Sequence, residues 1–143
     1  MKKSIVIGVL VLFGGSLAHA QEGELVSVDS QSDKAYYTYN QNYNIEPDGS
    51  YSGNIAAYFE DGAIEEVGVL NKGEKTGKWL KYNSEGNVIA SAKFKDGKKD
   101  DVWKIWDGNG QIRMTMYYDE GKRVGTWKFY DENGELINEK SYD

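Results

Sequence analysis

The feature that most constrains the fold is a repeat of 24 residues that runs through the second half of the chain. Trp79, Trp103 and Trp127 are separated by this step. Self-similarity at a fixed period is the signature of a repeat architecture, in which each period is one supersecondary unit. Five further columns keep the same phase: Tyr82, Trp106 and Tyr130; Gly86, Gly110 and Gly134; Val88, Ile112 and Leu136; Phe94, Tyr118 and Tyr142; Gly97 and Gly121. We therefore predict tandem repeats.

A fourth and more degenerate copy lies 24 residues upstream. It places the following residues in the same columns: Ile55, Tyr58, Gly62, Ile64, Leu70 and Gly73. Residues 51–143 therefore form one repeat domain. Its four units are 52–75, 76–99, 100–123 and 124 to the terminus.

The segment 21–50, which precedes the repeats, is polar and rich in Ser, Asn and Gln. Chains with few apolar residues bury too little surface to fold, so we expect this segment to be partly disordered, up to about Asp33. A strand that pairs with the first hairpin is expected from Lys34. Asp48 and Gly49 are in phase with the Asp-Gly or Gly turns of later units, which indicates a worn fifth unit.

Each unit has the pattern of a β-hairpin. Apolar residues alternate with polar ones in the second half of a unit, as in Val88, Ala90, Ala92 and Phe94, and a period of two is typical of a half-buried strand. The segments 83–87, 107–111 and 131–135 hold Gly, Asn and Asp, which tolerate tight turns. The predicted fold is all-β, an elongated antiparallel meander or solenoid of tandem β-hairpin repeats.

The chain begins with a pattern typical of a cleavable secretory leader. Lys2 and Lys3 precede an apolar stretch over 5–13 and the small-residue site Ala18-His19-Ala20. A membrane-spanning helix needs roughly 20 apolar residues, and this stretch is shorter. We predict a signal peptide over 1–20, with a retained anchor as the alternative. The mature chain would be periplasmic, bound in the cell envelope or extracellular, without membrane insertion.

Net charge narrows the classes of partner. The leader holds two of the 17 basic residues, so its removal leaves 15 against 23 acidic residues, a net charge of −8. An acidic surface repels phosphate backbones and anionic lipid. We therefore expect neither nucleic acid nor a membrane surface as a partner. The chain has no cysteine, so its stability has to come from packing and strand pairing.

The repeat itself resembles a known family. One unit reads Gly77-Lys78-Trp79-Leu80-Lys81-Tyr82, then Glu85-Gly86-Asn87-Val88, then Phe94-Lys95-Asp96-Gly97-Lys98-Lys99. This string is similar to the bacterial variant of the MORN repeat, and the resemblance extends over about residues 51–142. It implies a short exported protein of β-hairpin repeats, of a kind often described as the antitoxin component of toxin–antitoxin systems. Eukaryotic relatives are associated with scaffolding and membrane binding.

Composition argues against an enzyme. His19, the one histidine, lies in the predicted leader, so the mature chain has neither His nor Cys. This excludes a Ser-His-Asp triad, a Cys nucleophile and the usual zinc sites. Paired carboxylates would suffice for a glycosidase, but acids such as Asp61 and Glu85 fall in predicted turns, where solvation explains them. We predict no catalytic residues and no cofactor.

Two turns resemble the middle of a calcium-binding loop. They read Asp107-x-Asn109-Gly110 and Asp131-x-Asn133-Gly134. A complete loop needs another acid two residues earlier and a bidentate Glu near its end, and both turns lack them. We interpret these segments as hairpin turns and predict no metal site.

The aromatic columns carry the functional hypothesis. Trp79, Trp103 and Trp127 are out of phase with Tyr82, Trp106 and Tyr130, so an unbulged strand would place the two columns on opposite faces. A one-layer sheet does not bury both faces. We interpret the Trp column as structural repeat aromatics. The candidate binding residues are those of the other column: Tyr58, Tyr82, Trp106 and Tyr130.

The expected function is a non-enzymatic binding or scaffold module that presents this aromatic-lined sheet face to a protein partner. A cell-envelope glycan is the alternative ligand, since aromatic rings with an apolar body suit stacking as well as peptide capture. The family resemblance adds an antitoxin-like inhibitor as a further alternative.

The first prediction concerns export. In natively expressed protein, mass spectrometry of the intact chain should show an N-terminus at Gln21, because the small residues at Ala18 and Ala20 fit a signal-peptidase site. A cytoplasmic protein that retains residues 1–20 would contradict it and favour the antitoxin interpretation.

Overall fold

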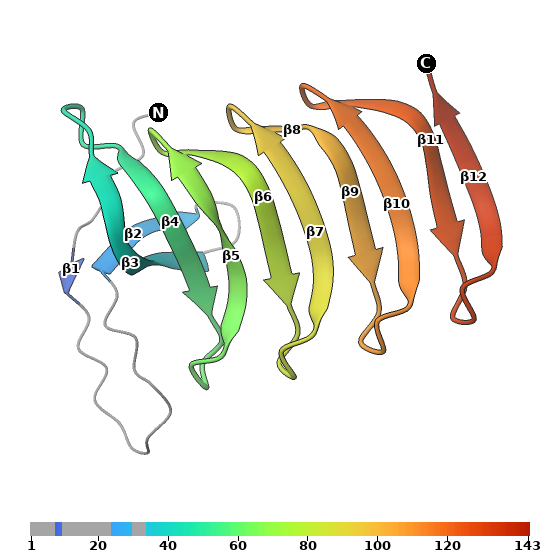
Figure 1. The fold of residues 1–143 in the computed structure, drawn as a ribbon, viewed down its shortest axis with the longest axis horizontal. Helices are drawn as coiled ribbons and strands as arrows, with labels where there is room; N and C mark the ends of the chain where they lie inside the picture. Colours follow the sequence, from blue (N-terminus) through green and yellow to red (C-terminus); the bar gives the residue numbers. More distant parts are fainter. Residues whose placement is uncertain (1–7, 10–23, 30–33) are drawn as a thin grey trace.

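The computed structural model describes residues 8–9, 24–29 and 34–143, with the side chains of Tyr36 and of the residues from Tyr43 onward. These residues form one antiparallel sheet of twelve strands (Figure 1). The strands follow one another across the sheet in chain order, except that the short strand β8 lies beside β7 only. The described residues are strands and turns, without a helix. The predicted all-β antiparallel meander is confirmed.

The strand bounds are as follows. The N-terminal strands are β1 (Gly8–Val9), β2 (Glu24–Asp29) and β3 (Lys34–Ile45). The first two repeat units hold β4 (Tyr51–Tyr58), β5 (Ile64–Asn71), β6 (Glu74–Tyr82) and β7 (Val88–Lys95). The second unit ends with β8 (Lys98–Lys99), and the last two units hold β9 (Asp101–Trp106), β10 (Ile112–Asp119), β11 (Lys122–Tyr130) and β12 (Leu136–Tyr142).

The turns inside the hairpins, which we name the first-row turns (59–63, 83–87, 107–111 and 131–135), share one hydrogen-bond pattern. In the second unit the Asn83 amide donates to the Asn87 carbonyl at 2.9 Å and the Gly86 amide donates to the Asn83 carbonyl at 3.0 Å. The Asn83 side chain accepts the amides of Glu85 and Asn87. Asp107 and Asp131 repeat this arrangement. Side-chain oxygens that accept nearby amides are what favours Asn and Asp in turns.

The turns that join one hairpin to the next, which we name the second-row turns (71–74, 95–98 and 119–122), have a different geometry. Lys72, Asp96 and Glu120 have φ values of 49°, 48° and 44°, and the glycine after each also has a positive φ. Two consecutive positive φ angles define the type I′ turn that matches the twist of paired strands. Each of these glycine amides also donates to a carbonyl of the preceding unit, as Gly97 does to Lys75 at 2.9 Å. The turns therefore tie neighbouring units together.

The segment 21–50 is more ordered than we expected in the part that the structure describes. β3 begins at Lys34, where a strand was predicted. The region expected to be disordered contains β2, whose residues Leu25 and Val28 lie opposite Tyr37 and Ala35 of β3. Backbone pairing between the two strands explains this difference, because a polar strand still fills its hydrogen bonds against a partner strand. Most of the predicted leader lies outside the described residues.

The expected fifth unit is represented by the turn between β3 and β4. The Glu46 amide donates to the Ser50 carbonyl and the Gly49 amide donates to the Glu46 carbonyl, both at 2.8 Å. This is the bonding of a first-row turn, although the turn lies along the edge of the second-row turns, at the top of Figure 1. The spacing of Gly49 identified its place along the chain but not its turn type.

The core lies where the sheet is two layers thick. β2 and the first part of β3 run across β4 and β5 (Figure 1). Beneath them the side chains of Tyr51, Ile55 and Trp79 are only 1%, 1% and 2% exposed. From β7 onward the described sheet is a single layer and most of its apolar side chains are half-buried.

This architecture predicts that the sheet tolerates deletion of a whole unit but not deletion of half a unit. Deletion of residues 100–123 should leave a shorter folded β protein, because the join restores the register between neighbours. Deletion of residues 107–118 should leave one hairpin arm unpaired and lower the melting temperature sharply. Circular dichroism melts of the two variants test this, and equal tolerance of both deletions would contradict the repeat fold.

Candidate functional site

The two aromatic columns lie on opposite faces of the sheet. In β6, four consecutive residues from Trp79 to Tyr82 each have a partner in β7. The register shift before Tyr82 skips Ile89 of β7 but no residue of β6, so β6 keeps its alternation and Trp79 and Tyr82 point to opposite sides. β9 and β11 repeat this pairing for Trp103 with Trp106 and for Trp127 with Tyr130. We name the two sides the Trp face and the Tyr82 face.

On the Trp face the rings form one continuous ladder. Each Trp alternates with an aromatic residue from the second strand of a hairpin, so that Trp103 contacts Phe94 at 5.1 Å and Tyr118 at 5.4 Å between ring centroids. Offset and edge-on contacts at such distances are favourable beyond their buried area. The members in order are Tyr36, Trp79, Phe94, Trp103, Tyr118, Trp127 and Tyr142.

A column of cations accompanies this ladder at the same period. The ammonium of Lys75 lies 4.0 Å from the centroid of Trp79, and that of Lys99 lies 4.5 Å from Trp103. The guanidinium of Arg123 lies 5.2 Å from the centroid of Trp127. Cations within about 6 Å of a ring face are attracted by its quadrupole. The three cations keep the 24-residue spacing of the repeat, a signal for this column that the prediction from the aromatic columns did not use.

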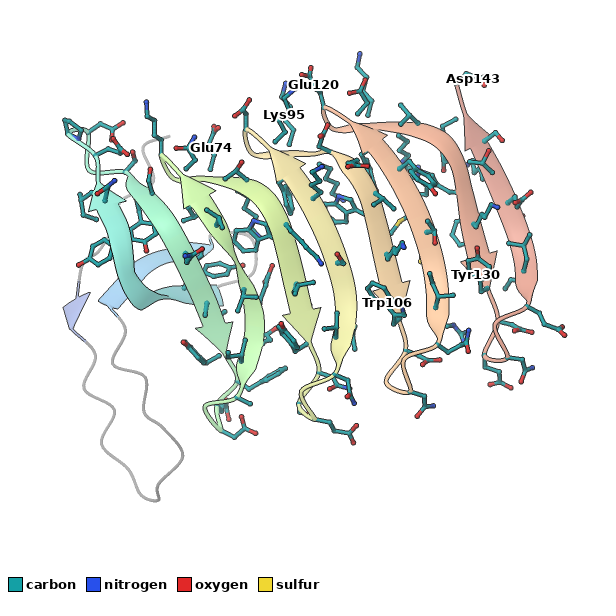
Figure 2. The ribbon with its side chains drawn as sticks, viewed as in Figure 1. Glu74, Lys95, Trp106, Glu120, Tyr130 and Asp143 are labelled. Atoms are coloured by element: carbon teal, nitrogen blue, oxygen red, sulfur yellow. The ribbon has the colours of Figure 1, made fainter. Side chains whose placement is uncertain are left out.

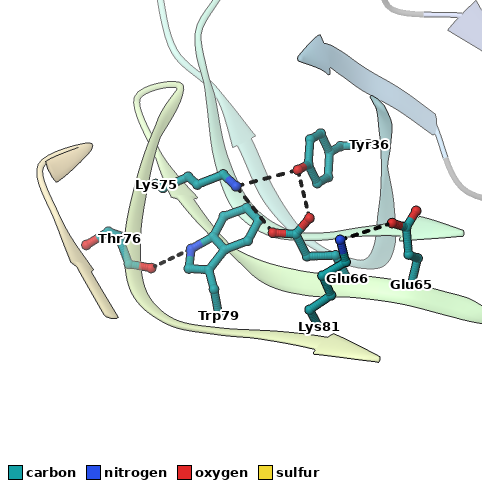
Figure 3. Close-up of polar contacts among 7 residues, drawn as sticks. All are labelled: Tyr36, Glu65, Glu66, Lys75, Thr76, Trp79 and Lys81. Atoms are coloured by element: carbon teal, nitrogen blue, oxygen red, sulfur yellow. Dashed lines mark hydrogen bonds and ion pairs between the residues drawn. The ribbon is translucent and has the colours of Figure 1, made fainter. Parts of the chain in front are cut away.

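The first unit adds a polar network to the ladder (Figure 3). The Tyr36 hydroxyl donates to Glu66 Oε2 at 3.1 Å, and Lys75 Nζ lies 3.3 Å from Glu66 Oε1. Lys75 also donates to the Tyr36 hydroxyl at 3.5 Å. Tyr36 comes from β3, so this network fastens the N-terminal layer to the repeats. The ring of Tyr36 packs edge-on against Trp79.

Trp79 is oriented differently from the other two tryptophans. Its indole N–H donates to the Thr76 carbonyl at 3.2 Å, three residues back, whereas Trp103 and Trp127 each donate to a carbonyl ten residues back. The ring of Trp79 occupies the space above Gly68, where a Cβ atom would overlap it. The next units carry Ala92 and Met116 in that column. The missing side chain of Gly68 therefore permits the deeper position of Trp79.

A backbone feature before each Trp places these rings on the ladder. Gly77 and Gly125, two residues before their tryptophans, have φ values of 65° and 63°. Asp101 has φ 55° at the same position although it is not glycine. It also forms an ion pair of 2.7 Å with Lys93, and this bond to the Lys93 ammonium holds the pKa of the Asp101 carboxyl below its usual range.

The candidate binding residues lie on the Tyr82 face beside the first-row turns. Each is opposite the first residue of the next strand, as Tyr82 is opposite Val88, and a register shift follows each pair. Figure 2 shows Trp106 and Tyr130 near the ends of β9 and β11. All four side chains are half-buried. The four pairs are Tyr58 with Ile64, Tyr82 with Val88, Trp106 with Ile112 and Tyr130 with Leu136.

These pairs form a second apolar band. Among the described residues, the ring contacts of the ladder include neither Tyr82, Trp106 nor Tyr130. The aliphatic partners at both ends are exposed, with 37% of Ile64 and 49% of Leu136 accessible. The part of the band formed by Tyr82, Trp106 and Tyr130 with their partners is therefore apolar surface outside the stacked rings of the ladder.

Ionic groups on the described part of the chain are dispersed. Its ion pairs link strands or turns, as between Lys128 and Glu139 at 3.6 Å. No group of three or more His, Cys, Asp or Glu side chains within the described ranges is placed to hold a metal ion. The same residues include no helix that is long and apolar enough to span a membrane.

The contact between Gly68 and Trp79 gives a testable prediction. Gly68→Ala should lower the free energy of unfolding by about 1–3 kcal/mol, the usual cost of overpacking, because the new Cβ displaces the Trp79 ring. Gly108→Ala is the matched control, since its nearest neighbour would lie 3.7 Å away. Chemical denaturation measures both, and equal stability of the two variants would contradict the packing described.

Comparison with known proteins identifies the repeat type. Residues 123–143 match the family described as the MORN repeat variant. These residues cover nearly all of β11 and all of β12, which form the last hairpin. No curated protein and no solved structure gives a significant match to the chain. The chain carries a MORN-type repeat, and the resemblance seen in the sequence is confirmed at that level.

Proposed function

We propose that this protein is an exported, non-enzymatic binding module that presents the Tyr82 face to a protein partner. The MORN-type repeat in the last hairpin favours a binding or scaffold role. The observation that carries the proposal is the different use of the two aromatic columns. The rings of the Trp column pack against other rings within the ladder. The column of Tyr82, Trp106 and Tyr130 lies half-buried along a band of aliphatic side chains.

The geometry of this band suits a protein ligand. Aromatic residues of this kind are enriched at the centres of protein interfaces, because they bury a large area with little loss of conformational freedom. Successive units are two strands apart, so the aromatic residues recur at about 10 Å. A rigid sheet that repeats the same pair of side chains offers several anchors to one partner without rearrangement.

Two alternatives are distinguished by the ligand. An envelope glycan would stack on the same rings, and an inhibitor of the antitoxin kind would bind a toxin protein through the same face. A pull-down from envelope extract, run in parallel with a glycan array, separates a protein ligand from a sugar ligand. Export is part of the proposal and is tested by the N-terminus of the mature chain.

The unlike roles of the columns predict unlike effects of two substitutions in the same strand. Trp103→Ala should reduce the free energy of unfolding by about 3 kcal/mol or more, because it removes a ladder ring. Trp106→Ala should leave stability nearly unchanged and weaken binding of the captured partner by about 1–3 kcal/mol, as expected for an aromatic anchor.

Denaturation curves and binding isotherms of the two variants test this directly. Lys104→Ala, on the Tyr82 face between the two tryptophans, is the control for nonspecific effects on β9. Equal loss of stability in both tryptophan variants would show that both columns are structural, and would remove the case for a recognition face there.

A further inference from the structure

The surroundings of Trp79 show how the Trp face is covered at its N-terminal end. Lys75 lies over Trp79, and its ammonium is neutralised by Glu66 at 3.3 Å. Tyr36 from the crossing strand packs edge-on against Trp79 with a centroid distance of 5.9 Å and donates its hydroxyl proton to Glu66. One unit of the ladder is therefore completed by three groups: a carboxylate, a tyrosine ring and a phenolic hydroxyl.

Later units keep the cation and the Trp but lose the carboxylate and the tyrosine of a crossing strand. The column of Glu66 continues as Ala90 and Met114. Lys99 and Arg123 are exposed, and within the described part of the chain neither takes part in an ion pair. The Arg123 guanidinium instead donates to the Tyr142 hydroxyl at 3.4 Å.

Most rings beside these cations are partly exposed, although Trp127 under Arg123 is buried at 6% exposure. No strand crosses the ladder beyond β6 in the described residues (Figure 1). Trp103, Tyr118 and Tyr142 are half-buried. Lys99 lies 4.5 Å from the centroid of Trp103 and 5.1 Å from that of Tyr118. This surface combines aromatic rings with two cations that no carboxylate of the described chain neutralises.

We propose that the Trp face between Lys99 and Arg123 binds an acidic, tyrosine-bearing peptide in extended conformation, which lies across β7 to β11 as the N-terminal strands lie across β4 and β5. Its carboxylates pair with Lys99 and Arg123, and its tyrosine ring packs edge-on against the half-buried Trp103. A second copy of the chain does not fit, because face-to-face contact would bring the same two cations together.

The spacing of the cations defines the sequence of the peptide. Lys99 and Arg123 belong to successive units, two strands or about 10 Å apart. A peptide in the extended polyproline II conformation repeats every three residues and advances about 3.1 Å per residue, so acidic side chains three residues apart lie on the same side of the peptide and reach both cations. This inference concerns the face opposite to the Tyr82 face and does not rest on the function proposed for it.

Peptide selection tests the proposal on the full chain. Twelve-residue random peptides displayed on phage are selected against the protein, and the strongest binder is synthesised for calorimetry. We expect selected peptides to contain Tyr or Trp with two acidic residues three positions apart. Binding should weaken with added salt, because exposed charges are screened.

Charge reversal locates the site. The double variant Lys99→Glu, Arg123→Glu should weaken binding of the synthesised peptide by about tenfold or more, since like charges then face each other. Lys104→Glu is the matched control, because Lys104 is an exposed lysine of β9 on the opposite face, and should change binding by less than about twofold. Lys99→Met, which keeps the packed side-chain stem, serves if the double variant is unstable.

Trp106→Ala separates this site from the proposed function, because it should weaken the partner of the Tyr82 face and leave the acidic peptide bound. The proposal is overturned if selection yields no binder, if selected peptides lack acidic residues, or if Lys104→Glu weakens binding as much as the double variant. The proposal would also be overturned if no peptide bound at Lys99 and Arg123 while an acidic oligosaccharide bound there tightly.

Discussion

The aromatic ladder is the interaction on which the rest of the structure depends. A single hairpin is marginal in water, and a one-layer sheet offers no second layer to bury its apolar side chains. Trp103 shows the solution, because its ring contacts Phe94 of the preceding unit and Tyr118 of its own. Each unit is stabilised by its neighbours, as in other linear repeats, so that the interior of this protein is a line of rings.

The two ends of the ladder are closed in different ways. At the N-terminal end a second layer covers it, and Tyr36 packs edge-on against Trp79, which is 2% exposed. At the other end, in the described sheet, β12 has mostly exposed side chains, and Lys140 lies 5.2 Å from the centroid of Tyr142. A lysine on an edge strand discourages pairing with other chains. Charge therefore protects the β12 edge of the sheet, whereas a packed second layer covers the ladder at the N-terminal end.

The sequence predicted the strands and their faces better than it predicted the orientation of individual side chains. A strict period and alternating side chains specify where the hairpins lie and which side chains share a face of the sheet. Trp103 and Trp106 are three residues apart, so an alternating strand places them on opposite faces. The orientation of Trp79 above Gly68 was not predictable in this way, because it depends on which side chain is absent from the neighbouring strand. Nor was the positive φ of Asp101, since glycine marks that position in the units on either side. The role of Tyr36 depends on a strand crossing that no local pattern encodes.

The cation column shows how one residue type serves two purposes along a repeat. The stem of a lysine covers ring surface while its charged end stays in water, so Lys75, Lys99 and Arg123 all complete the ladder. Only the first, at 28% side-chain exposure, has a carboxylate within the described chain. Where the second layer is present, the charge is neutralised internally. Beyond that layer the ring contact persists while the charge is left to solvent, and this difference between units is what makes the uncovered part of the Trp face selective for an acidic ligand.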